Sequence, residues 1–144
     1  MNLEQKIYQL TYKSKAVSEI SKENLQDILK TADLHNKERN ITGCLLYYNG
    51  YFSQILEGNK EDVLYIYNKI VQDSRHENVE LLWDGETDKR YFPNWNMSFF
   101  SPETQSETLY VNNYIMLSQF SDVSSGSTLS FWSSVQKIIN SKKN

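Results

Sequence analysis

The hydrophobic and polar positions of residues 41–57 predict two antiparallel strands joined by a tight turn at Asn49-Gly50. A two-residue type I′ turn requires positive φ at both central positions, and Asn and Gly adopt it at least cost. With that turn, Leu45 lies opposite Gln54, and both side chains belong to one largely apolar face. A buried amide without a partner costs about 1–3 kcal/mol, so we expect a polar group beside Gln54. A backbone group or a tyrosine hydroxyl with no functional role would also satisfy this requirement.

Two further inward-facing polar side chains are predicted before this hairpin. Residues 7–14 alternate between apolar and polar positions, which predicts a half-buried strand with Tyr12 on its apolar face. Ser21 is a suitable N-cap for a helix with an apolar stripe that ends near Asn36. Asn36 lies four residues beyond the last stripe residue, on the same helical face, so its amide should point inward.

A second helix is predicted from an N-cap at Asn59, with an apolar stripe at helical spacing. This segment ends in a charged cluster that contains Asp73, Arg75 and His76. Cations are favoured at the C-terminal end of a helix dipole, so the pattern alone allows Arg75 and His76 a purely electrostatic role at the surface.

Strands are predicted at residues 79–83 and 91–100, the second interrupted by Pro93. Alternation places Trp95, Met97 and Phe99 on one face of the last strand. The resulting order is βαββαββ, and right-handed crossovers place both helices on one face of the sheet. The predicted fold class is therefore α+β with a ferredoxin-like sheet.

Two more helices are predicted after residue 100, separated by a serine-rich break at residues 121–127. Their predicted apolar stripes are, first, Leu109, Asn113, Met116, Leu117 and Phe120 and, second, Phe131, Trp132, Val135, Ile138 and Ile139. The other hairpin face, which carries Cys44, is also apolar, so these helices are expected either to cover it or to pair with another copy. We expect a domain at residues 1–100 and a helical extension at residues 101–144.

The composition of the chain argues against several classes of partner and site. The chain has 144 residues, the length of one domain, and its net charge of -3 with a pI near 5.4 argues against nucleic acid or an anionic membrane as a partner. It has no apolar run of membrane-spanning length, and we expect a cytoplasmic protein. A single cysteine and two histidines support neither a metal site nor a Ser-His-Asp triad. Ten Tyr, six Phe and three Trp suit a pocket for a flat conjugated ligand.

Five stretches, in order, resemble the BLUF family of flavin-binding blue-light sensors. They are LTYKSKA around Tyr12, HNKERNITGCLLY around Asn36, GYFSQILEG around Gln54, IVQDSRHENV at 70–79 and FPNWNM at 92–97. The resemblance covers about residues 5–100. It implies a flavin held without a covalent bond between the two helices, usually FAD, with FMN or riboflavin as other forms.

The resemblance also implies roles for individual residues. Asn36 would bond the polar edge of the ring, Gln54 would reach its N5 and O4 region, and Tyr12 would donate to Gln54. Arg75 and His76 correspond to residues near the other ring carbonyl, and Asp73 to one near the ribityl chain.

The implied function is photoreception and not enzymatic catalysis. Light-driven transfer of an electron and a proton from Tyr12 to the flavin would leave the amide of Gln54 rearranged. Trp95 and Met97 would relay the change, unless they are only core residues. Because residues after 100 carry no cyclase, phosphodiesterase or DNA-binding pattern, we expect output through a homo-oligomer or an unidentified downstream protein.

Two other functions remain open from the residues alone. A hydrolase resembling acylphosphatase would need a phosphate cradle of backbone amides, but the loop at 13–21 contains no glycine. An interaction module without a chromophore would use the same tyrosine and amides for structure only. A flavin spectrum that shifts to the red in blue light would exclude both. Ser53 stands where BLUF relatives often have an aromatic residue, and it is expected to face away from Gln54 and to affect only packing there.

Overall fold

The computed structural model describes residues 6–18, 20–94, 96–117 and 125–142, with the backbone alone at 116, 117, 125–129 and 142. Its sheet has the strand order β4-β1-β3-β2-β5, and the β2–β5 pair is parallel while the other pairs are antiparallel. This arrangement confirms the predicted ferredoxin-like α+β class. The elements are β1 (Ile7–Ala16), α1 (Lys22–Glu38), β2 (Thr42–Tyr48), β3 (Tyr51–Gly58), α2 (Lys60–Gln72), β4 (His76–Thr87), β5 (Ser98–Phe100), α3 (Gln105–Leu117) and α4 (Ser125–Lys142).

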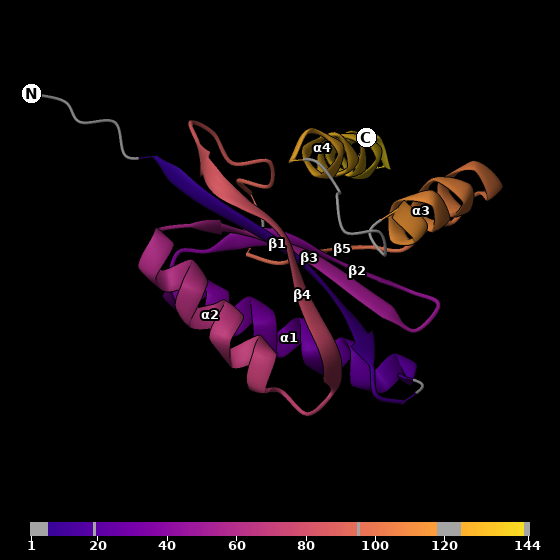
Figure 1. Cartoon of the computed structure of the whole chain (residues 1–144), viewed down its shortest axis with the longest axis horizontal. Helices are drawn as coiled ribbons and strands as arrows, with labels where there is room; N and C mark the ends of the chain where they lie inside the picture. Colours follow the sequence, from indigo (N-terminus) through magenta and orange to yellow (C-terminus); the bar gives the residue numbers. More distant parts are fainter. Residues whose placement is uncertain (1–5, 19, 95, 118–124, 143–144) are drawn as a thin grey trace, which may run out of the picture.

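Helices cover both faces of the sheet (Figure 1). The first pair, α1 and α2, lies on one face, and α3 and α4 lie on the other. As a result, β1 is buried on both sides, and the prediction of a half-buried strand was wrong. Thr11 is fully buried and Lys13 is 5% exposed although both belong to the more polar face of the strand.

The central hairpin has the predicted register, because Leu45 pairs with Gln54 across β2 and β3. Asn49 and Gly50 have φ values of 53° and 84°, as the two-residue turn requires. The predicted helix caps are also present: the side chain of Ser21 accepts from the backbone of α1, and that of Asn59 from the backbone of α2.

The predicted strand at residues 91–100 was too long, because among the described residues of this segment only Ser98–Phe100 pairs in the sheet. The buried carboxylate of Glu57 accepts hydrogen bonds from the backbone N–H groups of Tyr91 and Phe92, at 2.6 and 2.8 Å. Those donors are therefore not available to a strand ladder, and Pro93 has no N–H to offer. By contrast, β4 begins at 76 and ends at 87, well beyond the predicted 79–83.

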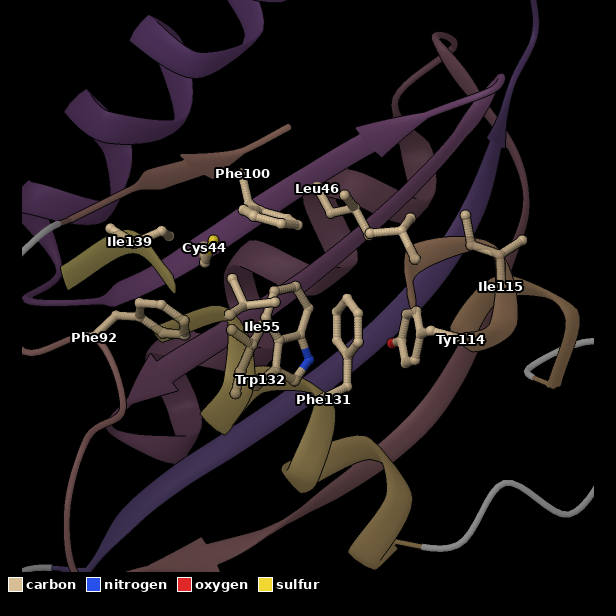
Figure 2. Close-up of a cluster of buried hydrophobic side chains, with 12 residues drawn as sticks. Cys44, Leu46, Ile55, Phe92, Phe100, Tyr114, Ile115, Phe131, Trp132 and Ile139 are labelled. Carbon is tan, nitrogen blue, oxygen red and sulfur yellow. The ribbon is translucent and has the colours of Figure 1, made fainter. Parts of the chain in front are cut away.

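The face covered by α3 and α4 forms an aromatic-rich core (Figure 2). The second predicted stripe is correct, since α4 places Phe131, Trp132 and Val135 in this core. The helix itself begins at 125, inside the predicted break at 121–127; residues 121–124 lie outside the described part of the chain.

The stripe predicted for the first tail helix was wrong at the two positions whose side chains the structure describes. Leu109 is 57% exposed and Asn113 is exposed, whereas Val111, Tyr114 and Ile115 are buried. The side chains of 116 and 117 are not described, and Phe120 lies outside the described residues. Apolar residues occur on several sides of this helix, so spacing alone does not identify the packed face. In the described part of the chain, no helix combines the length and the apolar character needed to cross a membrane.

Candidate functional site

A cavity of about 390 Å³ lies between the sheet and the helices α1 and α2. This volume falls in the range of roughly 300–1,000 Å³ that is typical of small-molecule sites. Its walls combine apolar side chains of both helices with a few polar groups from β1, β3 and the start of β4. The lining residues are Tyr12, Ile28, Thr31, Ala32, His35, Asn36, Leu45, Gln54, Ile66, Lys69, Ile70, Gln72, Asp73, Arg75 and His76.

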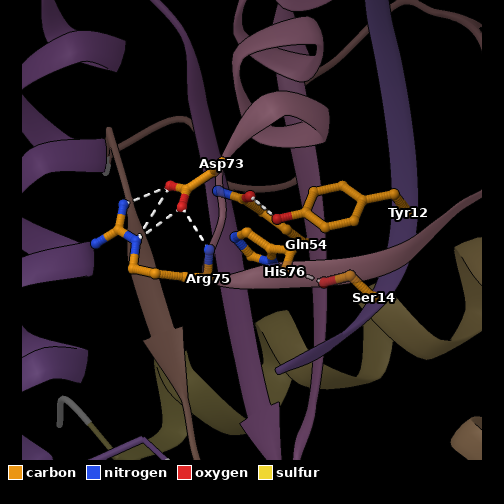
Figure 3. A network of polar contacts seen from close by, with 6 residues as sticks. All are labelled: Tyr12, Ser14, Gln54, Asp73, Arg75 and His76. Carbon is orange, nitrogen blue, oxygen red and sulfur yellow. Dashed lines mark hydrogen bonds and ion pairs between the residues drawn. The ribbon is translucent and has the colours of Figure 1, made fainter. Parts of the chain in front are cut away.

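Tyr12 and Gln54 meet on the sheet wall of the cavity because their positions pair directly across β1 and β3. The Tyr12 hydroxyl donates to Oε1 of Gln54 at 2.6 Å (Figure 3). Burial raises the pKa of the Tyr12 phenol, so it keeps its proton and remains a donor at neutral pH. Nε2 of Gln54 lies 3.2 Å from Sδ of Met97, and a thioether is only a weak acceptor.

The amide of Asn36 faces the same cavity from the last turn of α1. Its Nδ2 donates to the backbone carbonyl of Asn96 at 3.0 Å. Its Oδ1 is buried and accepts no hydrogen bond within the described part of the protein. An unpaired buried amide oxygen is costly, so this atom fits a ligand that brings an N–H group.

The rim of the cavity at the end of α2 carries an ion pair between Asp73 and Arg75. The guanidinium NH2 group of Arg75 lies 2.5 Å from Oδ2 of Asp73, and its Nε also donates to the carboxylate (Figure 3). These hydrogen bonds hold the pKa of Asp73 below its ordinary value. The pair therefore presents a fixed, charged group at the open edge of the cavity.

His76 is the first residue of β4, lines the cavity and packs between the rings of Phe52 and Tyr12. Its ring centroid lies 4.8 Å from that of Phe52 and 6.3 Å from that of Tyr12. Its Nδ1 is 2.8 Å from Oγ of Ser14. Burial lowers the pKa of His76; the nearby Asp73 carboxylate opposes this shift and the charge of Arg75 adds to it.

The structure brings most of the predicted site residues to one place. Those that line the cavity are Tyr12, Asn36, Gln54, Asp73, Arg75 and His76. Met97 does not line it but contacts Gln54 from the segment before β5. Trp95 lies outside the described residues. His76 belongs to a strand and packs in the cavity wall, so the interpretation as a surface residue at a helix end does not hold for it.

Several polar residues of the site were missed from the sequence, among them Ser14 and Lys69. Ser14 follows Tyr12 by two positions, so strand alternation places it on the same face and could have identified it. Lys69 lies one position before Ile70 of the predicted stripe of α2, and lines the cavity from its edge. A charge at this position carries no pattern that distinguishes it from an ordinary surface lysine.

A family model described as "Sensors of blue-light using FAD" matches residues 7–98. The chain belongs to the BLUF family. BLUF proteins are blue-light sensors that bind flavin, and the match spans every residue that lines the cavity.

Similar proteins include larger light-regulated enzymes and short BLUF proteins. The photoactivated adenylate cyclase subunit beta of Euglena gracilis is 38% identical over 95 residues, which are 65% of this chain and 11% of that protein. A bacterial light-regulated adenylyl cyclase matches with a TM-score of 0.71 and 36% identity, over 78% of this chain and 34% of its own. BlsA in its photo-activated state matches with a TM-score of 0.74 and 27% identity, over 90% and 94%. This BLUF chain thus spans about a tenth of the curated relative it matches.

The cavity residues fit a flavin on their chemistry. A flat tricyclic ring suits walls formed by Ile28, Leu45 and Ile66, and its imide N–H matches the unpaired Oδ1 of Asn36. Its ring carbonyls accept hydrogen bonds, and within the described part of the chain Nε2 of Gln54 has the weakly accepting sulfur of Met97 as its partner.

Proposed function

We propose that this BLUF chain is a blue-light photoreceptor in which Tyr12 and Gln54 form a hydrogen-bond switch beside a non-covalently bound flavin, FAD in the first instance. The observation that carries the proposal is the 2.6 Å hydrogen bond from Tyr12 to Gln54 on the cavity wall. A buried phenol that donates directly to the amide of Gln54 provides one hydrogen-bond donor and one group that can reverse its hydrogen bonding.

The polar cavity residues would hold and orient the ring. Asn36 would accept through Oδ1 from the imide N–H, and Gln54 would donate through Nε2 to an acceptor of the ring. Arg75, fixed by Asp73, and His76, fixed by Ser14, supply donors at the other end of the cavity. Convergent polar groups of this kind set the orientation of a flat ligand whose binding energy comes from apolar contact.

Bound flavin supplies blue-light absorption and an excited state that accepts an electron. Tyr12 would give an electron and then its hydroxyl proton to the bound flavin and would take both back, so that it ends chemically unchanged. During this exchange the amide of Gln54 turns over, because its carbonyl and amino ends are interchangeable in shape but opposite in hydrogen bonding. After this rotation, Oε1 of Gln54 would point toward Met97. The contact between Nε2 of Gln54 and Sδ of Met97 would be lost, and the segment before β5 would be released.

The signal would leave by association and not by catalysis in this chain. Helix α3 exposes Leu109 and Tyr110, at 57% and 37%, next to the core that covers the sheet. Exposed apolar side chains on an element packed against the sensor suit a contact surface for a second copy or a downstream protein.

Two variants and a matched control test the switch. Tyr12→Phe and Gln54→Leu should fold and bind flavin but show no red shift in blue light, because each removes one side of the 2.6 Å hydrogen bond. Tyr67→Phe is the control, because this substitution removes a hydroxyl from the neighbouring helix at a ring that lies 5.9 Å from that of Tyr12. It should keep the red shift. A complete photocycle in either switch variant would refute the role of that residue, and failure of the parent protein to bind flavin would refute the proposal itself.

A further inference from the structure

The sheet face that points away from the cavity makes two polar contacts with the tail helices, one from β1 and one from β3, and both occur beside Tyr12. Nε1 of Trp132 in α4 donates to Oγ1 of Thr11 at 3.1 Å. Oγ of Ser53 in β3 donates to the backbone carbonyl of Tyr12 at 2.9 Å and lies 3.0 Å from the hydroxyl of Tyr114 in α3. All of these side chains are at most 7% exposed.

The direction of the hydrogen bonds between α3 and Tyr12 follows from the number of protons. Ser53 has one hydroxyl hydrogen, and a carbonyl can only accept, so that hydrogen points to Tyr12. The Tyr114 hydroxyl must therefore be the donor in its contact with Ser53. The result is an ordered chain from Tyr114 through Ser53 to the backbone of Tyr12. The expectation that Ser53 faces away from Gln54 holds, but Ser53 contacts the backbone of the switch residue.

The strand is irregular at this point. The pairing of β1 with β4 shifts register between Thr11 and Tyr12, because Thr11 pairs with Trp83 and Tyr12 with Leu81. Bulges of this kind are common beside functional sites, where they interrupt regular pairing. On the β4 side, the backbone of Tyr12 is therefore held less regularly than the run from Ile7 to Thr11, and the side-chain contact from Ser53 gains in relative weight.

Tyr114, the end of this hydrogen-bond chain that lies in α3, is tightly packed. The ring of Tyr114 stacks on that of Phe131 in α4, with centroids 3.8 Å apart and an interplanar angle of 8° (Figure 2). A displacement of Tyr114 consequently moves both tail helices. Bistable packed elements, unlike continuously deformable ones, convert small local shifts into discrete changes.

We propose that Ser53 and Tyr114 are positioning residues that couple Tyr12 to α3 and α4 through the sheet. The coupling rests on the proposed photoreceptor function, and it supplies a path through β1 and β3 that does not involve β5. Coupling between two sites is reciprocal, so the tail helices also influence Tyr12 and the return of the switch to darkness.

The test uses the full chain loaded with FAD and two variants, Tyr114→Phe and Ser53→Ala. Tyr110→Phe is the matched control, because it removes a hydroxyl from the same helix at a partly exposed ring that also stacks on Phe131. Three quantities are measured: the size of the red shift, the dark-recovery rate, and amide hydrogen exchange of residues 105–115 in darkness and light.

The coupling predicts that both variants keep the red shift, change the recovery rate at least about threefold and lose more than half of the light-induced exchange difference in α3. A purely structural role for the hydroxyls would leave the recovery rate unchanged. Wild-type recovery and wild-type exchange in Tyr114→Phe would overturn the inference, as would a red shift in the parent protein without any response of α3. Absence of the red shift in the parent protein would instead refute the photoreceptor function, and the coupling with it.

Discussion

The two faces of the sheet are each covered by a helix pair, and the two pairs meet the sheet in different ways. Between the sheet and α1 and α2 remains a cavity of about 390 Å³, and the buried Oδ1 of Asn36 on its wall has no partner in the described chain. On the opposite face, Trp132 and Phe131 fill the space, and the hydroxyls of Thr11 and Ser53 are hydrogen-bonded.

An unpaired buried oxygen alone does not distinguish the faces. Oε1 of Gln9 also lacks a partner among the described residues, and it lies on the tail-helix face, where Nε2 of the same side chain donates to Glu57 at 2.7 Å. The difference is that Asn36 borders a cavity of ligand size, whereas Gln9 lies in a crowded cluster around a carboxylate. One face is thus arranged to receive a molecule that the protein does not supply, and the other is completed by the chain itself.

The largest effect that should separate the faces is a loss of stability. Trp132→Ala should lower the free energy of unfolding by about 3–5 kcal/mol, because Trp132 is fully buried and its removal leaves a cavity in a packed core. Ile28→Ala, on the wall of the existing cavity, should cost only about 1–2 kcal/mol, since there is less packing to lose. Urea unfolding of the flavin-free protein measures both. Equal losses would contradict the distinction between a packed and an open face.

A smaller effect should separate the faces by ligand affinity. Asn36→Ala should weaken flavin binding about tenfold, the effect of one hydrogen bond of roughly 1–1.5 kcal/mol, while the stability of the flavin-free protein changes by less than about 1 kcal/mol. Thr11→Val, the control on the other face, removes the acceptor of the Trp132 indole and should reduce stability by about 1–2 kcal/mol. Its flavin affinity, measured by fluorescence titration, should not change. Tight binding by Asn36→Ala would contradict the assignment of its Oδ1 as a ligand acceptor.

The cavity face was predictable from the sequence because its signals are local. The turn at Asn49-Gly50 sets the register of Gln54, strand alternation orients Tyr12, and helical spacing orients Asn36. Each of these inferences uses neighbours within a few residues, and the structure brings the three side chains to one cavity.

The tail-helix face was less predictable because it depends on contacts between residues far apart in the chain. The sequence pattern places Tyr91 and Phe92 in a strand. Their N–H groups instead donate hydrogen bonds to the carboxylate of Glu57, which is more than 30 residues away in the sequence. Likewise, the packed side of α3 is determined by the partners that Tyr114 finds in β3 and α4, and not by the spacing of its own apolar residues. Local periodicity contains no information about such partners.

The smallest difference between the faces should appear as a pH dependence. Burial holds the pKa of His76 in the cavity wall below its ordinary value, so between pH 6.5 and the lowered pKa the unfolded chain binds more protons than the folded one. This group should therefore reduce the stability of the flavin-free protein as the pH falls from 7.5 to 5.5. The expected loss is below about 1 kcal/mol, since partial exposure to solvent screens the charge. His76→Asn, which keeps a polar atom within reach of Ser14, should flatten this part of the profile in urea unfolding.

The tail-helix face should contribute a slope of the opposite sign. Burial raises the pKa of Glu57 above its ordinary value, although Tyr91, Gln9, Phe92 and Arg90 oppose the shift. The folded carboxyl retains its proton up to a higher pH than the unfolded one. The protein therefore loses stability as the pH rises from 4.5 through the raised pKa. The sign of the slope therefore identifies the face that titrates. If His76→Asn leaves the decline toward pH 5.5 intact, that decline arises from a group outside the cavity wall, and His76 does not distinguish the two faces.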